Sequence, residues 1–223
     1  MSSVSFASPV RTPPVAVIDF ETTGMGPSRG ARATEIAVVL VEDGQITGRY
    51  QSLMHTGAWV PPFIESLTGI SSAMLADAPP AAAVMREVAE FTRGLPLVAH
   101  NAAFDRSFWE AEMALAGLPP DPAHHFACTL LLSRRLWPEA PDHKLGTLVT
   151  WAGLTRDGRA HRAMSDADVT AQLLIRLQQH AAERWADALG PQGADHGLLC
   201  EVQTQSRRVL ARGWVPSRAA APL

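Results

Sequence analysis

The sequence is poor in cysteine and has no long apolar segment. Its two cysteines, Cys128 and Cys200, lie far apart in a chain of 223 residues, and their spacing does not suggest a zinc site. Sparse cysteine favours a reduced, cytoplasmic protein. No apolar run approaches the roughly 18 residues of a membrane span, and the first residues lack the apolar core of a signal peptide. We therefore expect no membrane partner.

An excess of basic charge is also missing. The chain has 19 Lys and Arg against 22 Asp and Glu, which gives a formal net charge of −3 at pH 7. This balance gives no overall attraction to nucleic acid, so a polyanionic partner would have to be held by local basic residues or by bound metal. Hydrophobic residues make up 47% of the sequence, which is enough for the core of one large domain or of a domain with an appendage.

The order of β-forming and helical segments predicts the fold class. Five strands are expected: at residues 15–20, in the two arms of a hairpin within 34–54 that turns at Asp43–Gly44, at 95–100 and at 124–129. Helices are expected at 62–76, 80–93, 103–117, 129–136, 144–152 and 165–181. Successive strands, followed by strands that alternate with helices, favour an α/β layer fold with a mixed sheet.

The two ends of the chain differ from the part between them. Residues 1–14 are rich in Ser and Pro and are predicted to be a flexible N-terminal tail. Residues 15–182 form the expected domain. Residues 183–223 are predicted to be a C-terminal extension with a linker and one helix at about 198–212, whose apolar face must pack on the domain or on a protein partner. Trp185 and Trp214 bracket this segment and favour packing on the domain.

The segment VIDFETTG, Val17–Gly24, places two acids inside an otherwise apolar strand. Asp19 and Glu21 are two residues apart, so their side chains point to the same face of the strand. Two buried carboxylates side by side repel each other, and their burial is costly unless they are neutralised. A bound cation is the simplest neutraliser, and other parts of the chain should then contribute further ligands.

Three more polar side chains stand near the starts of predicted helices. Asp105 follows the apolar segment LPLVAH in the first turn of a helix, where the strand-end loops of α/β sheets place ligand sites. Asp166 begins the last helix of the domain, and His161 precedes it by five residues. Each has an ordinary alternative, because acids are common at helix starts and His161 could be an exposed loop residue.

Taken in order, the segments DFETTG, HNAAFD and HRAMSD resemble the three motifs of the DEDDh family. These DnaQ-like 3′–5′ exonucleases include the proofreading epsilon subunit of bacterial DNA polymerase III. The resemblance covers roughly residues 15–180. TEIAVV around Glu35, LTGI at 67–70 and HKLGTL at 143–148 are similar to weaker family motifs, whereas Cys128–Thr129 stands where many members have Asp-Thr. The resemblance implies a ribonuclease H-like three-layer α/β fold, with a mixed five-stranded sheet flanked by helices.

The resemblance also implies a chemistry for the acids. Asp19, Glu21, Asp105 and Asp166 would hold two Mg²⁺ or Mn²⁺ ions, which prefer hard oxygen ligands. His161 would be the general base for the attacking water, because histidine readily accepts a proton near neutral pH. The implied reaction is hydrolysis of single-stranded DNA or RNA from its 3′ end to nucleoside 5′-monophosphates, and the ETTG form of the first motif favours DNA.

Substrate contacts are predicted around these residues. Thr22 and Thr23 would reach the 3′-terminal nucleotide, and Leu67 would wedge against its base unless it simply packs in the core. His100 and Asn101 would shape the floor of the pocket, or else satisfy the backbone groups of a turn. A basic rim is predicted from arginines that include three flanking His161: Arg156, Arg159 and Arg162.

Two alternatives stay open at this point. An exoribonuclease resembling RNase T or oligoribonuclease would share the same carboxylates and would prefer RNA. A catalytically idle nucleic-acid-binding module would keep the fold, but it would have no need of four clustered acids. A nuclease assay with added metal separates these classes, and matched DNA and RNA oligomers separate the two enzymes.

Overall fold

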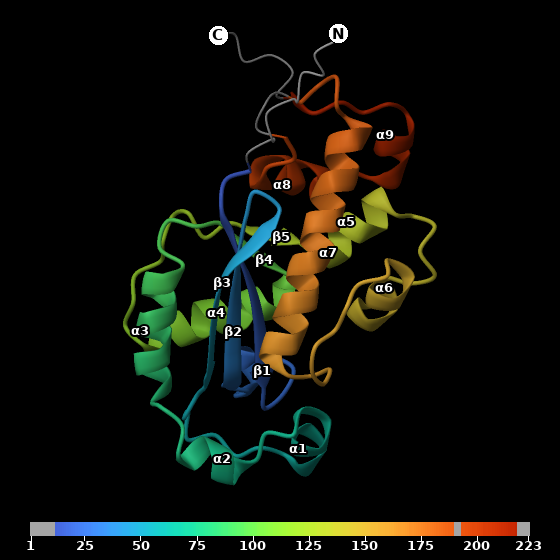
Figure 1. Cartoon of the computed structure of the whole chain (residues 1–223). Coiled ribbons are helices and arrows are strands. Elements are labelled where there is room, and N and C mark those ends of the chain that lie inside the picture. The colour runs from blue at the N-terminus through green and yellow to red at the C-terminus, as the bar shows by residue number, and fades with distance from the viewer. Residues whose placement is uncertain (1–11, 190–192, 218–223) are drawn as a thin grey trace, which may run out of the picture.

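A five-stranded sheet forms the centre of the computed structural model, which describes residues 12–189 and 193–217 (Figure 1). The strand order is β3-β2-β1-β4-β5. The pairs β1–β2 and β2–β3 are antiparallel, whereas β1–β4 and β4–β5 are parallel, so the sheet is mixed as predicted. The strands are β1 (Val15–Thr22), β2 (Ala33–Glu42), β3 (Gln45–Leu53), β4 (Leu97–Ala99) and β5 (Phe126–Cys128). Residues 1–11 of the predicted N-terminal tail lie outside the described residues.

The local sequence explains strands β1 and β2 and the turn that follows β2. β1 and β2 are rich in Val, Ile and Ala and are buried along almost their whole length, as strands in the middle of a covered sheet must be. The turn between β2 and β3 has positive φ at both central residues, Asp43 (50°) and Gly44 (71°). A tight hairpin of this hand requires that conformation, and Asp-Gly adopts it readily.

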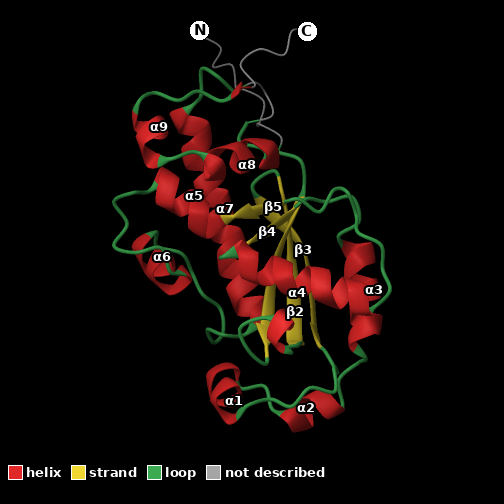
Figure 2. Ribbon diagram, turned by 180° about the vertical axis from the view of Figure 1, so that it is seen from behind, coloured by secondary structure: helices red, strands yellow, loops and turns green. Residues whose placement is uncertain are grey.

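Helices cover both faces of the sheet (Figures 1 and 2). On one face, α7 packs its Ala167, Ala171 and Leu174 into a cluster with Val17 and Val39 of the strands. On the other face, α3 and α4 pack against Ile18, Ile36 and neighbouring strand residues. The helices of the domain are α1 (Pro62–Thr68), α2 (Ser72–Ala76), α3 (Ala81–Phe91), α4 (Ala102–Leu115), α5 (Thr129–Leu136), α6 (Leu145–Trp151) and α7 (Ala163–Arg184), with a 3₁₀ turn, η1, at Pro27–Arg29. None of the helices in the described part of the chain is long and apolar enough to cross a membrane.

Two of the predicted helices are each broken in two. The segment 62–76 forms α1 and α2, because Gly69 ends α1 in the left-handed conformation (φ 76°) and Ser71 caps α2. The segment 198–212 forms α8 (His196–Thr204) and α9 (Arg207–Ala211). Gln205 is extended between them, and the hydroxyl of Ser206 accepts a hydrogen bond from the Val209 N–H at the start of α9.

The C-terminal helices pack on the rest of the chain. Leu198, Leu199, Val202 and Leu210 are buried in the same apolar cluster as α7. Trp185 and Trp214 lie edge to face, with ring centroids 5.3 Å apart. Most of the apolar face of this segment is therefore covered within the molecule, whereas Val209 is 41% exposed. Part of the predicted linker, residues 190–192, lies outside the described residues, and the domain boundary near 182 stays a prediction.

One side chain of α8 also covers the exposed edge of the sheet. β5 is an edge strand, and its outer backbone groups would otherwise lack partners. The side-chain oxygen of Gln203 accepts a hydrogen bond from the Cys128 N–H (2.8 Å), and its amide nitrogen donates to the Phe126 carbonyl (3.1 Å). The Gln203 amide thus makes the two backbone hydrogen bonds that a neighbouring strand would make to this edge of β5.

Replacing Gln203 tests this edge contact. Gln203→Ala leaves the Cys128 N–H and the Phe126 carbonyl without these partners, so we expect the free energy of unfolding to fall by about 1–3 kcal/mol. Chemical denaturation followed by circular dichroism measures the change. Gln179→Ala, which removes the same group from an exposed position of α7, is the matched control. Equal stability of the two variants would refute the proposed role of Gln203.

Candidate active site

The acids of the first motif lie on the central strand, where it approaches its carboxyl end. Asp19 is partly buried, and Glu21 is 9% exposed. Their alternation places both on one face of the sheet. Glu21 stands opposite Glu35 of β2 in the strand register, and the regular pairing of β1 with β2 is interrupted directly after it. The end of β1 is therefore lined with carboxylates inside a strand that is otherwise apolar.

Asp105 joins this group from the first turn of α4. It is 2% exposed, and its Oδ1 accepts a hydrogen bond from the Phe20 N–H of β1 (3.1 Å). The residue at the N-cap of α4 is Asn101, whose side chain makes no capping hydrogen bond. Asp105 is thus fixed by the strand that carries Asp19 and Glu21, which goes beyond the ordinary role of an acid at a helix start.

Asp166 and His161 complete the group from the start of α7 and the loop before it. The Asp166 Oδ2 accepts a hydrogen bond from the backbone N–H of His161 (2.8 Å), so the carboxylate holds the loop in place. His161 is exposed and has a positive φ of 60°. One ligand atom each of Glu21, His161 and Asp166 lies within 4.8 Å of the other two. The structure therefore brings the second and third motifs together with the first, as the resemblance predicted.

Burial and mutual repulsion dominate the electrostatics of the acids. Burial, and then the charges of Asp105, Asp166 and Glu21, raise the pKa of Asp19 well above its usual value. Burial, followed by the charge of Asp166, raises the pKa of Glu21 to about 8. Burial raises the pKa of Asp105 to about 7, although the hydrogen bond from Phe20 opposes the shift. Such a group of buried anions carries an excess of negative charge, and its hard oxygen atoms suit Mg²⁺ or Mn²⁺. The residues present thus fit a divalent metal centre.

Glu35 is a buried acid beside the site that the sequence marked only as part of a weaker motif. It is 1% exposed, and its carboxylate accepts hydrogen bonds from the Arg162 guanidinium (2.8 and 3.1 Å), the Gln51 amide (2.7 Å) and the Ala163 N–H (3.0 Å). The pair with Arg162 fixes the residue that follows His161. The signal available in the sequence was an acid, Glu35, within an apolar strand next to the strand of Glu21. Its partner Arg162 could not be recognised, because it lies 127 positions further along the chain.

The three arginines around His161 do not form a free basic rim. Arg156 donates to the Asp166 carboxylate and to the Ser165 hydroxyl, and Arg162 pairs with Glu35. Arg159 donates to the carbonyl oxygens of Ser66 (2.9 Å) and Leu67 (3.1 Å) at the end of α1. Each arginine ties the His161 loop to another element, so the expected rim is replaced by a set of internal contacts.

Two of the predicted substrate residues already have hydroxyl partners within the protein. The Thr22 hydroxyl donates to the Gly24 carbonyl (2.8 Å), and the Thr23 hydroxyl accepts from the Arg32 N–H (3.0 Å). These contacts hold the turn after β1. Substrate contacts of Thr22 and Thr23 stay predictions, and they would have to share these hydroxyl groups.

The other predicted substrate residues have different surroundings. Leu67 is partly buried and belongs to none of the three apolar clusters of the described residues, so simple core packing does not explain it. His100 hydrogen-bonds through its two ring nitrogens with the Thr129 hydroxyl and the His143 carbonyl, and burial lowers its pKa to about 4. His100 is therefore neutral, and its two hydrogen bonds connect the start of α5 at Thr129 with the loop at His143. Asn101 is exposed in the left-handed conformation.

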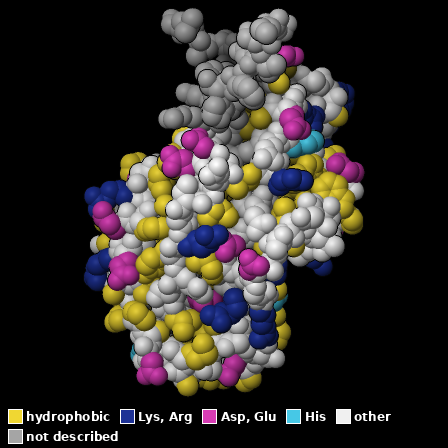
Figure 3. All heavy atoms as spheres, in the orientation of Figure 1, with side chains coloured by type: hydrophobic (Ala, Val, Ile, Leu, Met, Phe, Trp, Pro, Cys, Tyr) yellow, Lys and Arg dark blue, Asp and Glu magenta, His cyan; other side chains and the backbone are white. Residues whose placement is uncertain are grey.

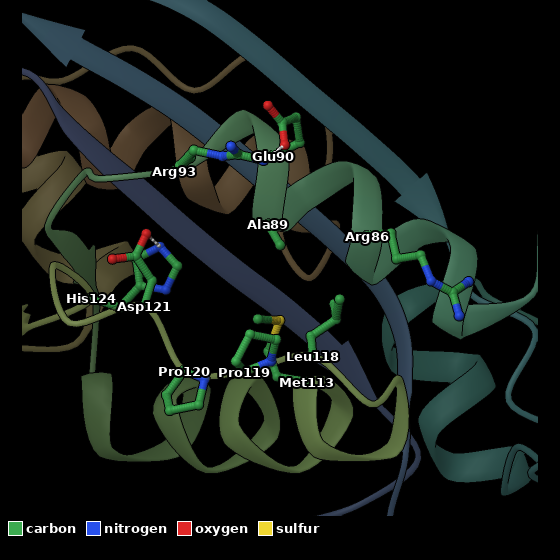
Figure 4. Close-up of a pocket in the computed structure, with 10 residues that line it drawn as sticks. All are labelled: Arg86, Ala89, Glu90, Arg93, Met113, Leu118, Pro119, Pro120, Asp121 and His124. Atoms are coloured by element: carbon green, nitrogen blue, oxygen red, sulfur yellow. Dashed lines mark hydrogen bonds and ion pairs between the residues drawn. The ribbon is translucent and has the colours of Figure 1, made fainter.

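One hollow in the structure lies away from these acids. A cavity of about 390 Å³ opens between α3 and the end of α4, and Figure 4 shows Arg86 and Arg93 on one side and Met113 and Pro120 on the other. None of the predicted catalytic or substrate residues lines it. The chemistry of the side chains, not the depth of a pocket, therefore identifies the site.

Comparison with known proteins gives a consistent assignment. The family model described as Exonuclease (RNase_T) matches residues 16–174, a range that contains all five residues of the predicted catalytic set. The chain is 39% identical over 161 residues to the 3′-5′ exonuclease DinG of Bacillus subtilis, a match over 72% of this chain and 17% of that protein. It is 34% identical over 194 residues to the DNA polymerase III subunit epsilon-like protein of Rhodobacter capsulatus, over 86% of this chain and 26% of that protein. The chain thus spans about a quarter or less of the length of these two relatives.

A solved structure supports the same fold. Exonuclease X in complex with 5′ overhanging duplex DNA superposes with a TM-score of 0.61 at 31% sequence identity, over 75% of this chain and 93% of that chain. The mixed five-stranded sheet flanked by helices is the ribonuclease H-like architecture predicted from the motifs.

The raised pKa values predict how the metal-free protein responds to pH. Glu21 has an ordinary pKa of 4.5 and a folded pKa of about 8, so the folded state binds its proton more tightly than the unfolded state. The free energy of unfolding should therefore fall as pH rises from about 4.5 to about 8. Urea denaturation with a chelator present measures this fall, and saturating Mg²⁺ should reverse it at the alkaline end.

Two variants isolate the contribution of Glu21. Glu21→Gln removes the titrating group, so its stability should fall less steeply over the same pH window. Glu42→Gln makes the same change at an exposed position at the end of β2 and should behave like the wild type. Parallel pH profiles for all three proteins would contradict the assignment of a raised pKa to Glu21.

Proposed function

The chain belongs to the exonuclease family whose model spans residues 16–174, and from this premise we propose that it removes nucleotides one at a time from the 3′ end of single-stranded nucleic acid, with DNA preferred. The products are nucleoside 5′-monophosphates. The observation that carries the proposal is the convergence of Asp19, Glu21, Asp105 and Asp166 at the end of β1, with His161 beside them. Buried acids in this number are destabilising in a protein that only binds nucleic acid, which argues against the idle module.

The four carboxylates would hold two divalent cations, Mg²⁺ or Mn²⁺. When bound, these ions neutralise the acids and supply the positive charge that stabilises the attacking and leaving oxygens of a phosphodiester. Phe20 keeps Asp105 in place through its backbone N–H, and β1 itself orients Asp19 and Glu21. The protein thus fixes the ligands on a strand and two helix starts, elements that move little.

In this proposal His161 accepts the proton of the attacking water. A ring nitrogen of its exposed imidazole lies within 4.8 Å of oxygens of Glu21 and Asp166, and its backbone is held by Asp166. As the water oxygen bonds to phosphorus, its proton passes to this nitrogen, and the bond between phosphorus and the 3′-oxygen of the preceding nucleotide breaks. The phosphate therefore leaves on the 5′-oxygen of the released nucleotide, and the shortened strand ends in a 3′-oxygen.

Two observations support DNA as the substrate. The DNA polymerase III subunit epsilon-like protein and exonuclease X, both more than 30% identical to the chain, carry names that refer to DNA polymerase III or to bound DNA. The ETTG form of the first motif also resembles DNA-acting members of the family.

Acidic and basic side chains are interspersed on the face in Figure 3, with no broad basic surface. Phosphate binding would therefore depend on the metal centre, for RNA as well as for DNA, and the exoribonuclease alternative is left to experiment.

Matched oligonucleotides test direction and substrate together. A single-stranded DNA labelled at its 5′ end should yield a ladder that shortens from the 3′ end, and a 3′ label should appear at once in a mononucleotide. The RNA of the same sequence should be degraded more slowly, and chelation should stop both reactions. Early release of the 5′ label would refute the direction, and faster hydrolysis of RNA would favour the exoribonuclease.

Substitution of His161 tests the proposed proton acceptor. His161→Gln removes the base while keeping side-chain size, so we expect kcat to fall roughly 10²- to 10⁴-fold. Mn²⁺ binding, measured by titration calorimetry, should persist because the four carboxylates remain. His125→Gln, at an exposed position before β5, is the control and should leave kcat unchanged. A His161 variant with wild-type kcat would remove this residue from the mechanism.

A further inference from the structure

Two large aromatic side chains are exposed on the segment that leads into α1. Trp59 is 69% exposed and Phe63 is 73% exposed. Aromatic residues make up only 6% of the sequence, and among the described residues one other aromatic side chain is exposed, Trp151 at 39%. Single exposed apolar residues are ordinary. Two aromatic rings four positions apart, both more than two thirds exposed, indicate a surface with a binding partner.

This segment is fastened to the loop that carries His161. The Arg159 guanidinium donates to the carbonyl oxygens of Ser66 and Leu67 at the C-terminal end of α1. Gly69 ends the helix in the left-handed conformation, where an added Cβ would lie 3.2 Å from the Arg159 Nη1. Figure 1 shows α1 beyond the ends of β1 and β2 and next to the loop that precedes α7. α1, which carries Phe63, is therefore tied to the loop that carries His161, and Trp59 lies just before this helix.

The spacing along α1 matches a strand of nucleic acid. Phe63 and Leu67 are four residues apart in one helix, so they share a face and are separated by about 6 Å along the axis. Successive nucleotides of a stacked strand are spaced by about 3.4 Å. If Leu67 meets the terminal base, Phe63 lies about two nucleotides upstream, and Trp59 precedes it by a further four residues.

We propose that Trp59 and Phe63 form a stacking platform for the bases upstream of the 3′ end of a single-stranded substrate, held to the His161 loop by Arg159. The proposal rests on the proposed exonuclease function and adds a subsite to it. Aromatic faces stack on any base, which suits an enzyme that must accept every sequence. The chain carries a net charge of −3, so stacking supplies affinity that long-range electrostatics does not.

Substrates that differ only in their bases test the platform. The first is a ten-nucleotide DNA, the second is the same strand with abasic sites at the second to fifth positions from the 3′ end, and the third is a dinucleotide. For the intact decamer, Trp59→Ala and Phe63→Ala should each raise KM about 5- to 100-fold. KM for the abasic decamer and for the dinucleotide should change less than twofold in either variant, and kcat should stay at the wild-type value for every substrate.

Conservative and distant variants complete the design. Trp59→Phe and Phe63→Tyr keep an aromatic face and should restore KM, whereas Trp151→Ala and Leu115→Ala remove exposed apolar side chains from α6 and α4 and should have no effect. An unchanged KM in the Trp59 and Phe63 variants would overturn the platform and leave the rings for a protein partner. An equal rise in KM for the abasic strand would also overturn it, because the rings would then act without stacking.

A binding measurement separates this proposal from the proposed function. Fluorescence anisotropy of the labelled decamer, with Ca²⁺ in place of Mg²⁺, reports affinity without turnover. One outcome is that the wild type hydrolyses no substrate, while the Trp59→Ala and Phe63→Ala variants bind the decamer more weakly than the wild type does. The exonuclease function then fails and the platform stands. If the wild type hydrolyses the decamer and neither variant loses affinity, the function stands and the platform fails.

Discussion

The burial of several carboxylates at the end of one central strand is the constraint on which the rest of the structure depends. β1 lies between β2 and β4 and is covered on both faces, so Asp19 and Glu21 cannot turn away into solvent without disrupting the sheet. Asp105 is held against the same strand by the Phe20 N–H. Lost hydration therefore raises the pKa of all three acids, and repulsion by neighbouring carboxylates adds to it at Asp19 and Glu21. The apolar packing of the sheet offsets this cost and keeps the acids ready for cations.

A second, polar layer of contacts organises the loop that carries His161. This loop has little apolar burial, and ionic and backbone contacts hold it instead. Arg162 pairs with the buried Glu35, Arg159 caps the end of α1, and the Asp166 carboxylate accepts the His161 N–H. The backbone of His161 itself has a positive φ, a conformation that is uncommon for residues other than glycine and that the surrounding contacts hold in place. The loop can therefore present an exposed imidazole in a defined position without being part of the core.

The sequence predicted the parts of this arrangement that depend on local pattern. Two acids in an apolar strand predicted a bound cation, and the resemblance of the three motifs to the DEDDh family implied that Asp105 and Asp166 would join it. The strands and most helices followed from periodicity. The role of Glu35 could not be predicted, because it depends on Arg162, which is distant in sequence. The three arginines were expected as a basic rim for the same reason, since composition does not reveal which carbonyl or carboxylate a guanidinium meets. The breaks near Gly69 and Ser206 depend on caps that a helix periodicity does not detect.

The C-terminal helices and the proposed active site lie at opposite ends of the sheet. α8 and α9 pack near one end of the sheet, whereas α1 and the loop before α7 lie toward the other (Figure 1). Asp19 and Glu21 stand near the carboxyl end of β1. Gln203 closes the free edge at β5, and the apolar residues of α8 extend the cluster under α7. The exonuclease match ends at residue 174, before these helices begin. Because α7 runs from Asp166 at the site to Arg184 near the extension, α8 and α9 pack against the helix that carries this predicted catalytic acid. We therefore expect them to act through the stability of α7, without contact with the substrate.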